Sequence, residues 1–183
     1  MTPFVSRAGL KLDHALTAFS IDAAGMTCAD LGCNVGGFVD CLLSRGAAKV
    51  YAIDTGYGAL AWKLRKDPRV IVMERTNAMH AQLPERVDLV TIDVAWTRQR
   101  RILPAARGLL AEEGRIITLI KPHYEADKSL LRDGVLPEQE VPNVVNKVKD
   151  DIQAAGLELI ATVISPIRGG KGNVEVLALL RAK

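Results

Sequence analysis

Three glycines between an apolar run and a helical pattern could hold a polar ligand close to the main chain. The stretch Thr27–Cys41 opens like a buried strand, passes through Gly32, Gly36 and Gly37, and continues with helical spacing. Glycine permits positive φ and lets a ligand approach the backbone where a side chain would block it. The free amides at the start of the helix favour a polar or anionic group. The pattern therefore predicts a strand, a loop and a helix arranged around a ligand.

An acid at the end of the next apolar run narrows the class of ligand. Asp54 follows Val50–Ile53, about 20 residues after the loop, where Rossmann-type sites place an acid on a ribose diol. The pairing predicts a ligand that contains a nucleoside. The spacing of Gly32, Gly36 and Gly37 fits poorly the Gly-x-Gly-x-x-Gly pattern that approaches a pyrophosphate. S-adenosylmethionine (SAM) has no pyrophosphate, so we expect SAM rather than NAD.

Two more charged residues follow apolar runs. Asp93 comes after Val87–Ile92, and Lys121 comes after Arg115–Ile120. Each has an ordinary explanation, because Asp93 could cap the next helix and Lys121 could be an exposed charge at a strand end. In open α/β sheets, however, ligands bind beyond the carboxyl ends of the strands. Together with Asp54, these residues predict a functional site at that edge.

The elements that must position these groups alternate along the chain, which is typical of a parallel sheet with helices on both faces. After the first apolar run we expect strands at Val50–Ile53, Val70–Met73, Val87–Ile92, Arg115–Ile120, Leu157–Ile164 and Val174–Leu180. Besides the helix after the glycine loop, we expect helices at Ser6–Phe19, capped by Ser6, and at Ala59–Lys66, Arg98–Leu110 and Val141–Ala155. The charged segment Glu125–Glu140 is expected to be a mobile loop. The turn Ser165–Asn173 contains no helix, so we expect the last strand to be antiparallel.

The predicted fold is therefore α/β and Rossmann-like, with helices on both faces of the sheet. It has a seven-stranded, mostly parallel sheet whose last strand is antiparallel.

Length and composition limit the alternatives. At 183 residues we expect one domain with a sizeable core. With 24 Lys+Arg against 21 Asp+Glu the net charge is +3, so any basic surface must be local. No apolar run approaches the roughly 20 residues of a membrane span, and we expect neither a signal peptide nor a membrane partner.

The cysteines lie close together in the sequence. Cys28, Cys33 and Cys41 match no common zinc spacing, and we expect no metal. We expect reduced, cytosolic thiols, with Cys28 and Cys41 in the core and Cys33 lining the ligand pocket.

Several segments together resemble a known family. FVSRAGLKL, DLGCNVGGF, VYAIDTGYGALAWKLR, ERTN, TIDVAW, LIKPHYEA and KGNVE are similar to segments of the FtsJ-like ribosomal-RNA 2'-O-methyltransferases, in particular the haemolysin-A-like (TlyA) branch. The resemblance covers Phe4–Leu180 and implies one methyltransferase domain over residues 1–183, whose N-terminal helix (1–20) completes the active site. It also implies a cytoplasmic enzyme that acts on ribosomal RNA or a ribosomal subunit.

Members of this branch carry a small RNA-binding S4 domain before the motif FVSRAGLKL, and none precedes that motif here. The chain is then either a catalytic fragment or a stand-alone enzyme that needs another way to hold RNA.

The resemblance also assigns catalytic positions. The family uses a Lys-Asp-Lys-Glu tetrad, which falls here on Lys11, Asp93, Lys121 and Glu175. Transfer to a 2'-hydroxyl requires removal of its proton, and a lysine at its ordinary pKa of about 10.4 cannot accept one at neutral pH. The role of base therefore depends on distances to neighbouring charges. We expect Lys121 to be the base, Asp93 and Glu175 to orient the reacting groups, and Lys11 to steady the developing oxyanion.

Binding residues follow from the same comparison. For the cofactor we expect Gly32, Cys33, Asn34, Gly36, Gly37, Phe38, Asp54, Asn77 and Asp93, although relatives often carry an acid at position 77 and a different loop at 33–35. For the RNA we expect Trp96, Arg98, Arg100, Arg101, Arg168 and Lys171, since such clusters hold phosphates while an aromatic ring stacks on a base. The arginines have an ordinary alternative as a solvated helix face.

Two other functions remain open at this point. A small-molecule methyltransferase of the same fold would explain the loop and Asp54 but not the two lysines. A non-catalytic module for RNA binding or assembly would explain a chain that lacks the S4 domain.

Overall fold

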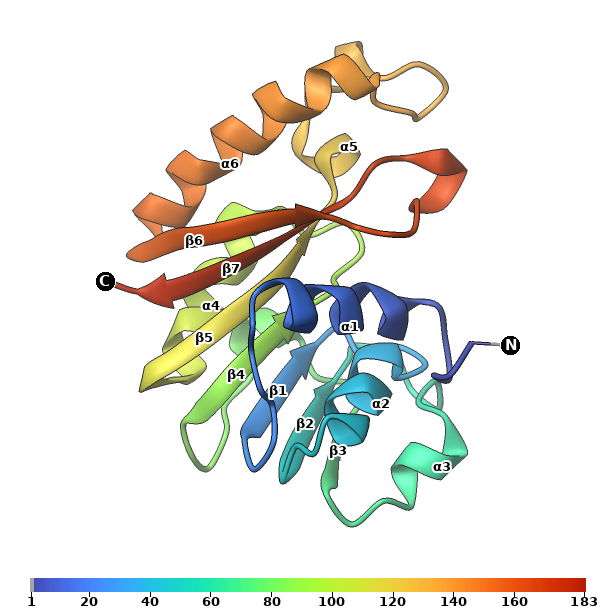
Figure 1. Cartoon of the computed structure of the whole chain (residues 1–183), viewed down its shortest axis with the longest axis vertical. Helices are drawn as coiled ribbons and strands as arrows, with labels where there is room; N and C mark the ends of the chain where they lie inside the picture. The colour runs from blue at the N-terminus through green and yellow to red at the C-terminus, as the bar shows by residue number, and fades with distance from the viewer. Residues whose placement is uncertain (1) are drawn as a thin grey trace.

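A seven-stranded mixed sheet forms the centre of the structure, a computed structural model that describes residues 2–183 (Figure 1). The strand order is β3-β2-β1-β4-β5-β7-β6, and only β7 runs antiparallel to its neighbours. The strands are β1 (Thr27–Leu31), β2 (Lys49–Ile53), β3 (Val70–Met73), β4 (Val87–Ile92), β5 (Leu110–Ile120), β6 (Leu157–Ile164) and β7 (Val176–Ala182). The predicted architecture is confirmed, including the reversed last strand.

Helices cover both faces of this sheet. The α-helices are α1 (Ala8–Ala18), α2 (Gly37–Ser44), α3 (Trp62–Arg65), α4 (Gln99–Leu109), α5 (Pro122–Glu125) and α6 (Val141–Ala154). The 3₁₀ turns are η1 (Ala78–His80), η2 (Lys128–Leu130), η3 (Glu138–Glu140) and η4 (Gly170–Gly172). Figure 1 shows α1 and α2 in front of the sheet and α4 behind it.

Two apolar layers follow from this arrangement. Leu12 and Leu16 of α1 pack with Phe38 and Leu42 of α2 on one face. On the other face, Ile102 of α4 and the buried stripe of α6 pack against the opposite sides of the same strands. Parallel strands buried on both faces are near-continuous apolar runs, as β1, β2 and β4 are here.

Most predicted boundaries agree with the structure within two residues, and the exceptions have physical causes. The helix expected at Ala59–Lys66 shortens to α3, because Ala61 still has an extended backbone. Strand β5 begins at Leu110 instead of Arg115, with an irregular register opposite Val87 and Leu89. The expected cap by Ser6 is wrong, since the residue before α1 is Arg7 and no side chain caps that end.

The segment Glu125–Glu140 contains η2 and η3, and a short bridge joins Arg132 to Val135. Within residues 2–183, no helix combines the length and apolar character needed to cross a membrane.

Candidate active site

The strand register brings the expected charges to one edge of the sheet. Leu31 lies opposite Ile53 on one side and Ile92 on the other, so Gly32, Asp54 and Asp93 leave three adjacent strands at the same level. Strand β5 pairs with β4 in the same direction and ends one residue before Lys121. Because parallel strands share their carboxyl edge, Asp54, Asp93 and Lys121 lie at one edge of the sheet, where the sequence predicts a site.

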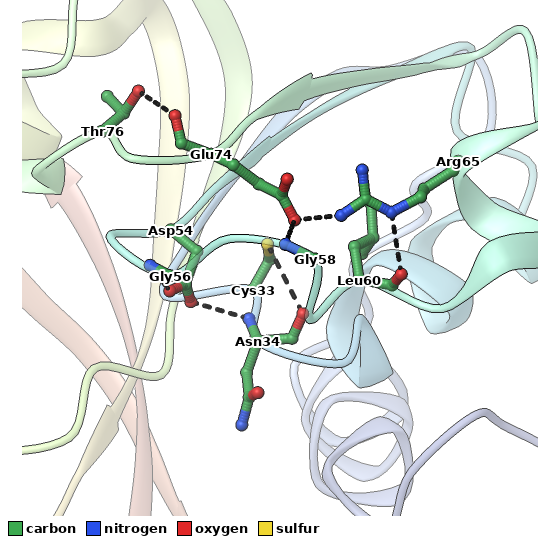
Figure 2. Close-up of polar contacts among 9 residues, drawn as sticks. All are labelled: Cys33, Asn34, Asp54, Gly56, Gly58, Leu60, Arg65, Glu74 and Thr76. Atoms are coloured by element: carbon green, nitrogen blue, oxygen red, sulfur yellow. Dashed lines mark hydrogen bonds and ion pairs between the residues drawn. The ribbon is translucent and has the colours of Figure 1, made fainter.

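Asp54 forms hydrogen bonds that order the glycine turn. Its Oδ2 accepts a hydrogen bond from the amide of Asn34 at 2.8 Å, and its Oδ1 accepts one from the amide of Gly56 at 2.7 Å (Figure 2). A carboxylate has about four lone-pair sites, so these two bonds leave capacity for a diol. Asp54 thus orders the loop and still faces the cavity beside it.

That cavity has a volume of about 350 Å³ and suits a nucleoside. It is bounded by Gly32, Asn34, Asp54, Asn77 and Asp93 among the expected cofactor residues. Further lining comes from residues that sequence reasoning did not select, namely Thr55, Thr76, Met79, Ala95 and Ile102.

A second cavity, of about 220 Å³, lies on the other side of the glycine turn. Gly32, Cys33, Asn34, Gly37, Phe38 and Asp93 line it, together with Lys121 and the start of α1. Asp93 and Gly32 border both cavities, so the two form adjoining parts of one site.

Asp30 is a residue of the site that the sequence reasoning did not select. Its side chain lines the second cavity and is 1% exposed. Its Oδ1 accepts a hydrogen bond from the Thr91 hydroxyl, whereas its Oδ2 has no partner among residues 2–183. Burial raises the pKa of Asp30 from 3.8 to about 8; the bond from Thr91 opposes this shift, and the charges of Asp93 and Asp54 add to it. An acid inside an apolar strand was the available signal, because buried carboxyls are rare unless paired.

The charge of the two cavities selects the kind of ligand. Three carboxyl groups, those of Asp30, Asp54 and Asp93, border them. The carboxyl groups of Asp54 and Asp93 disfavour a pyrophosphate there, whereas the ammonium of an incoming ligand would favour the ionised form of Asp30. The unpartnered oxygen of Asp30 is a ready acceptor for such an ammonium. The residues present therefore fit SAM.

The four tetrad positions meet at a third cavity, of about 340 Å³. They form two ion pairs: Lys11 Nζ lies 2.5 Å from Glu175 Oε2, and Lys121 Nζ lies 2.7 Å from Asp93 Oδ1. Lys121 also donates to the carbonyl of Val94 at 2.9 Å. Since Asp93 lines all three cavities, the tetrad adjoins the cofactor pocket.

Two glycines allow the close backbone contacts that hold the tetrad together. A Cβ at Gly37 would clash with Ser6 and Ala8, and a Cβ at Gly169 would clash with the carboxylate of Glu175. The first glycine lets the start of α1 dock on α2, which positions Lys11. The second lets the loop before β7 cover Glu175, which is 3% exposed.

The remaining predicted residues do not all reach the site. Gly36 borders none of the three cavities; its φ is +101°, and a Cβ there would clash with Leu60 and Leu64, so this glycine serves the packing of α3. Asn77 lines the nucleoside cavity, with its Oδ1 already accepting from the amide of Met79.

The expected RNA-binding residues separate into different places. Trp96 is 80% exposed at the rim of the nucleoside cavity, and Arg168 lines the tetrad cavity while pairing with Glu138. Arg98 and Arg100 instead border a different groove, between α4 and α6, and Arg101 borders none of these cavities. Lys171 donates to the carbonyl of Asp133.

The three cysteines are buried free thiols, as expected for core positions, and Cys33 lines the second cavity. Burial raises the pKa of Cys28 and of Cys41 to about 12, and it raises the pKa of Cys33 as well. Thiols of this kind remain protonated and unreactive.

Comparisons with known proteins identify the family. The model of the FtsJ-like methyltransferases matches residues 4–182. The 16S/23S rRNA (cytidine-2'-O)-methyltransferase TlyA of Mycobacterium tuberculosis (strain ATCC 25618 / H37Rv) is 42% identical over 187 residues, which cover 98% of this chain and 69% of that protein.

Solved structures with similar folds are consistent with this family. One from Streptococcus thermophilus, described as a hemolysin, has a TM-score of 0.96 at 36% identity and covers 100% of this chain and 68% of that one. Magnesium protoporphyrin IX methyltransferase of Synechocystis PCC 6803, solved with bound SAM, shares the fold with a TM-score of 0.66 at 16% identity; the match covers 97% of this chain and 79% of that one.

Proposed function

Because this chain belongs to the FtsJ-like methyltransferase family, we propose that it methylates a ribose 2'-hydroxyl of ribosomal RNA, at a cytidine. The observation that supports this choice is the tetrad cavity, where two lysine–acid pairs adjoin the cofactor pocket through Asp93. Cytidine is the nucleoside named for the relative from M. tuberculosis. Since ribosomal RNA is made and modified in the cytoplasm, we infer that the enzyme works there.

SAM is the methyl donor of this enzyme, and when bound it would supply its sulfonium methyl group to a ribose oxygen, with S-adenosylhomocysteine as the leaving group. Asp54 would hold the ribose of the cofactor, and the unpartnered Oδ2 of Asp30 would hold its ammonium. Asn77 can donate through its Nδ2 to an adenine nitrogen, because its Oδ1 is occupied by the amide of Met79. An amide can thus serve at a position where relatives often carry an acid.

The tetrad would act on the acceptor. In its neutral form, Lys121 would accept the hydroxyl proton on its lone pair while its two N–H groups donate to Asp93 and to the carbonyl of Val94. Lys11, fixed by Glu175, would stabilise the negative charge that develops on the oxygen. Most of the remaining rate would come from alignment of two bound substrates.

Labelled methyl transfer tests the proposal. The protein is incubated with methyl-labelled SAM and either purified ribosomal RNA or intact ribosomal subunits, and the RNA is digested to nucleosides for mass spectrometry. We expect label in 2'-O-methylcytidine, and loss of that label in Lys121→Ala. Label on a base, or transfer to small molecules with none to RNA, would contradict the proposed function.

A further inference from the structure

Two exposed aromatic rings lie beside the cofactor loop and away from the tetrad. Tyr57, in the loop after β2, is 72% exposed, and Trp62, at the start of α3, is 69% exposed. Neither borders the three cavities of the active site. Single exposed apolar side chains are common on protein surfaces, whereas a group of them marks an interaction site, and here two large aromatic rings occur within six positions.

Each ring carries a cation on one face. The guanidinium carbon of Arg75 lies 4.2 Å from the ring centre of Tyr57, and Lys66 Nζ lies 4.9 Å from the ring centre of Trp62. The acids nearby are already neutralised: Asp40 pairs with Lys63, Asp67 with Arg69 and Glu74 with Arg65. None of the ion pairs formed by residues 2–183 involves Lys66 or Arg75. The surface therefore combines open ring faces with cations that lack a carboxylate partner.

A partly buried acid holds these pieces in one arrangement. Glu74 Oε1 accepts hydrogen bonds from the amide of Gly58 at 2.8 Å and from the guanidinium of Arg65, as Figure 2 shows. The amide of Arg75 donates to the carbonyl of Gly56. The loop with Tyr57, helix α3 and the segment with Arg75 are thus tied together, so the rings are presented on a fixed support.

We propose that Tyr57, Trp62, Lys66 and Arg75, the aromatic–basic surface, bind an unpaired segment of the RNA substrate next to the methylated nucleotide; this rests on the proposed function. Bases stack on exposed rings, while neighbouring cations neutralise phosphates. Stacking on the open face of each ring leaves the cation on the other face in place. Charge complementarity favours RNA as the occupant over an apolar partner.

The distance along the sheet between the tetrad and the aromatic–basic surface can be spanned by a short RNA strand. From β5, which precedes Lys121, to β2, which precedes the Tyr57 loop, there are three strand spacings. At roughly 4.8 Å each these amount to about 14 Å, a few nucleotides of extended strand. An RNA strand that places a ribose in the tetrad cavity would cross the carboxyl edge towards this surface.

Binding and turnover of single variants test the inference. The probe is an unpaired oligocytidine RNA of about twelve nucleotides, a length in the range of single-strand binding sites. Its affinity is measured by fluorescence anisotropy with S-adenosylhomocysteine present. We expect Tyr57→Ala and Trp62→Ala to weaken binding roughly 5- to 150-fold each, as expected for the loss of one stacked base. Tyr57→Phe and Trp62→Phe should retain most of the affinity, because a ring face remains.

Charge variants supply a second readout. Lys66→Ala and Arg75→Ala should each reduce the slope of log K against log salt by about 0.7, the contribution of one phosphate contact on a single strand. Affinity for SAM should not change in any of these variants. Ile160→Ala and Lys149→Ala, at an exposed apolar residue on β6 and an exposed lysine on α6, are the matched controls and should bind RNA as the wild type does.

Different results would contradict the RNA contact at the aromatic–basic surface and the proposed function itself. If the wild type methylates ribosomal RNA and the alanine variants bind and methylate it equally well, the aromatic–basic surface is not an RNA contact. If these variants keep their RNA affinity but lose self-association in sedimentation, the surface binds protein, which also overturns the inference. If the wild type neither binds nor methylates RNA, the proposed function itself fails.

Discussion

Two neighbouring oxygen atoms hold the amine of Lys121, the proposed base, in a fixed position. Its Nζ lies between the carboxylate of Asp93 and the carbonyl of Val94, at 2.7 and 2.9 Å. Two acceptors fix the direction of the amine, so its remaining position can face a substrate hydroxyl in the tetrad cavity. A residue held in this way is sensitive to changes in both charge and shape.

We expect Lys121→Ala to reduce methyl transfer by at least ~10², the lower end of general-base contributions, with SAM affinity nearly unchanged. Lys121→Arg should be almost as damaging, because a guanidinium stays protonated and cannot accept the proton. Single-turnover rates and calorimetry with SAM measure the two effects. Lys49→Ala, which removes an exposed lysine paired with Glu85, is the control. Wild-type turnover in Lys121→Arg would replace the base assignment with a positioning role.

Asp30 links the cofactor site to stability. Its folded-state pKa is raised to about 8 from an ordinary 3.8, so between these values the folded state holds a proton that the unfolded state has lost. The free energy of unfolding therefore falls as pH rises across this window and is level above it. The carboxyl lowers stability at neutral and alkaline pH, which is a cost often found at functional sites.

Asp30→Asn should remove that pH dependence. We expect the ligand-free variant to have a higher Tm than the wild type at about pH 9, with the difference shrinking towards about pH 4. It should also bind SAM more weakly, because an amide, unlike the carboxyl of Asp30, cannot ionise in response to the ammonium. Thermal unfolding over this pH range and calorimetry with SAM measure both effects. A Tm difference that does not vary with pH would show that Asp30 is ionised in the folded protein.

At the scale of elements, a single asparagine joins the two loops that cover Glu175. Asn173 is 2% exposed; its Oδ1 accepts from the amide of Leu136 at 2.9 Å, and its Nδ2 donates to the carbonyls of Gly134 and Gly170 at 3.1 and 3.0 Å. Its own carbonyl accepts from the amide of Gly169, which lies against Glu175. The arrangement of Glu175 thus depends on a contact between segments 134–136 and 170–173.

We expect Asn173→Ala to cost about 1–3 kcal/mol of stability, since a buried amide loses its acceptor, and to lower kcat while the KM for SAM stays unchanged. The stability and kcat of Asn173→Asp should lie between those of the wild type and of Asn173→Ala. The carboxylate can accept from the amide of Leu136 but cannot donate to the carbonyls of Gly134 and Gly170. Asn143→Ala, at an exposed position of α6, is the control. A stability loss with an unchanged single-turnover rate would limit Asn173 to a structural role.

At the scale of the whole molecule, one sheet carries most of the site, and helix α1 adds Lys11. The cofactor cavities lie at the ends of β1, β2 and β4, and the tetrad adds β5 and the residue before β7. Both helical layers pack against these strands. We therefore propose that residues 1–183 fold as one cooperative domain.

A cofactor that binds only the folded state should then stabilise the whole chain at once. At about 100 times its Kd, SAM adds roughly 2.7 kcal/mol, which corresponds to a rise in Tm of roughly 5–11 °C for a chain of this size. Differential scanning calorimetry should show one transition that shifts with SAM, and NAD at the same concentration should leave Tm unchanged. Two separate transitions would contradict the single domain, and a shift with NAD would contradict the cofactor preference.

The sequence by itself determined the fold class, the cofactor and the edge of the sheet where the site lies. Alternating apolar runs specify parallel strands, and residues that follow such strands must emerge at one edge; Asp54, Asp93 and Lys121 could therefore be grouped without coordinates. Lys11 and Glu175 were placed by family resemblance alone.

Tertiary structure decided which side chains face one another. Lys11 meets Glu175 across 164 positions, Asp30 is buried beside a cavity, and Arg98 and Arg100 border a different groove from the tetrad. Periodicity indicates which face of an element is buried, but not which distant segment covers it. Burial, and with it the pKa of Asp30, depends on that covering segment, so these properties arise only when the helices and loops pack on the sheet.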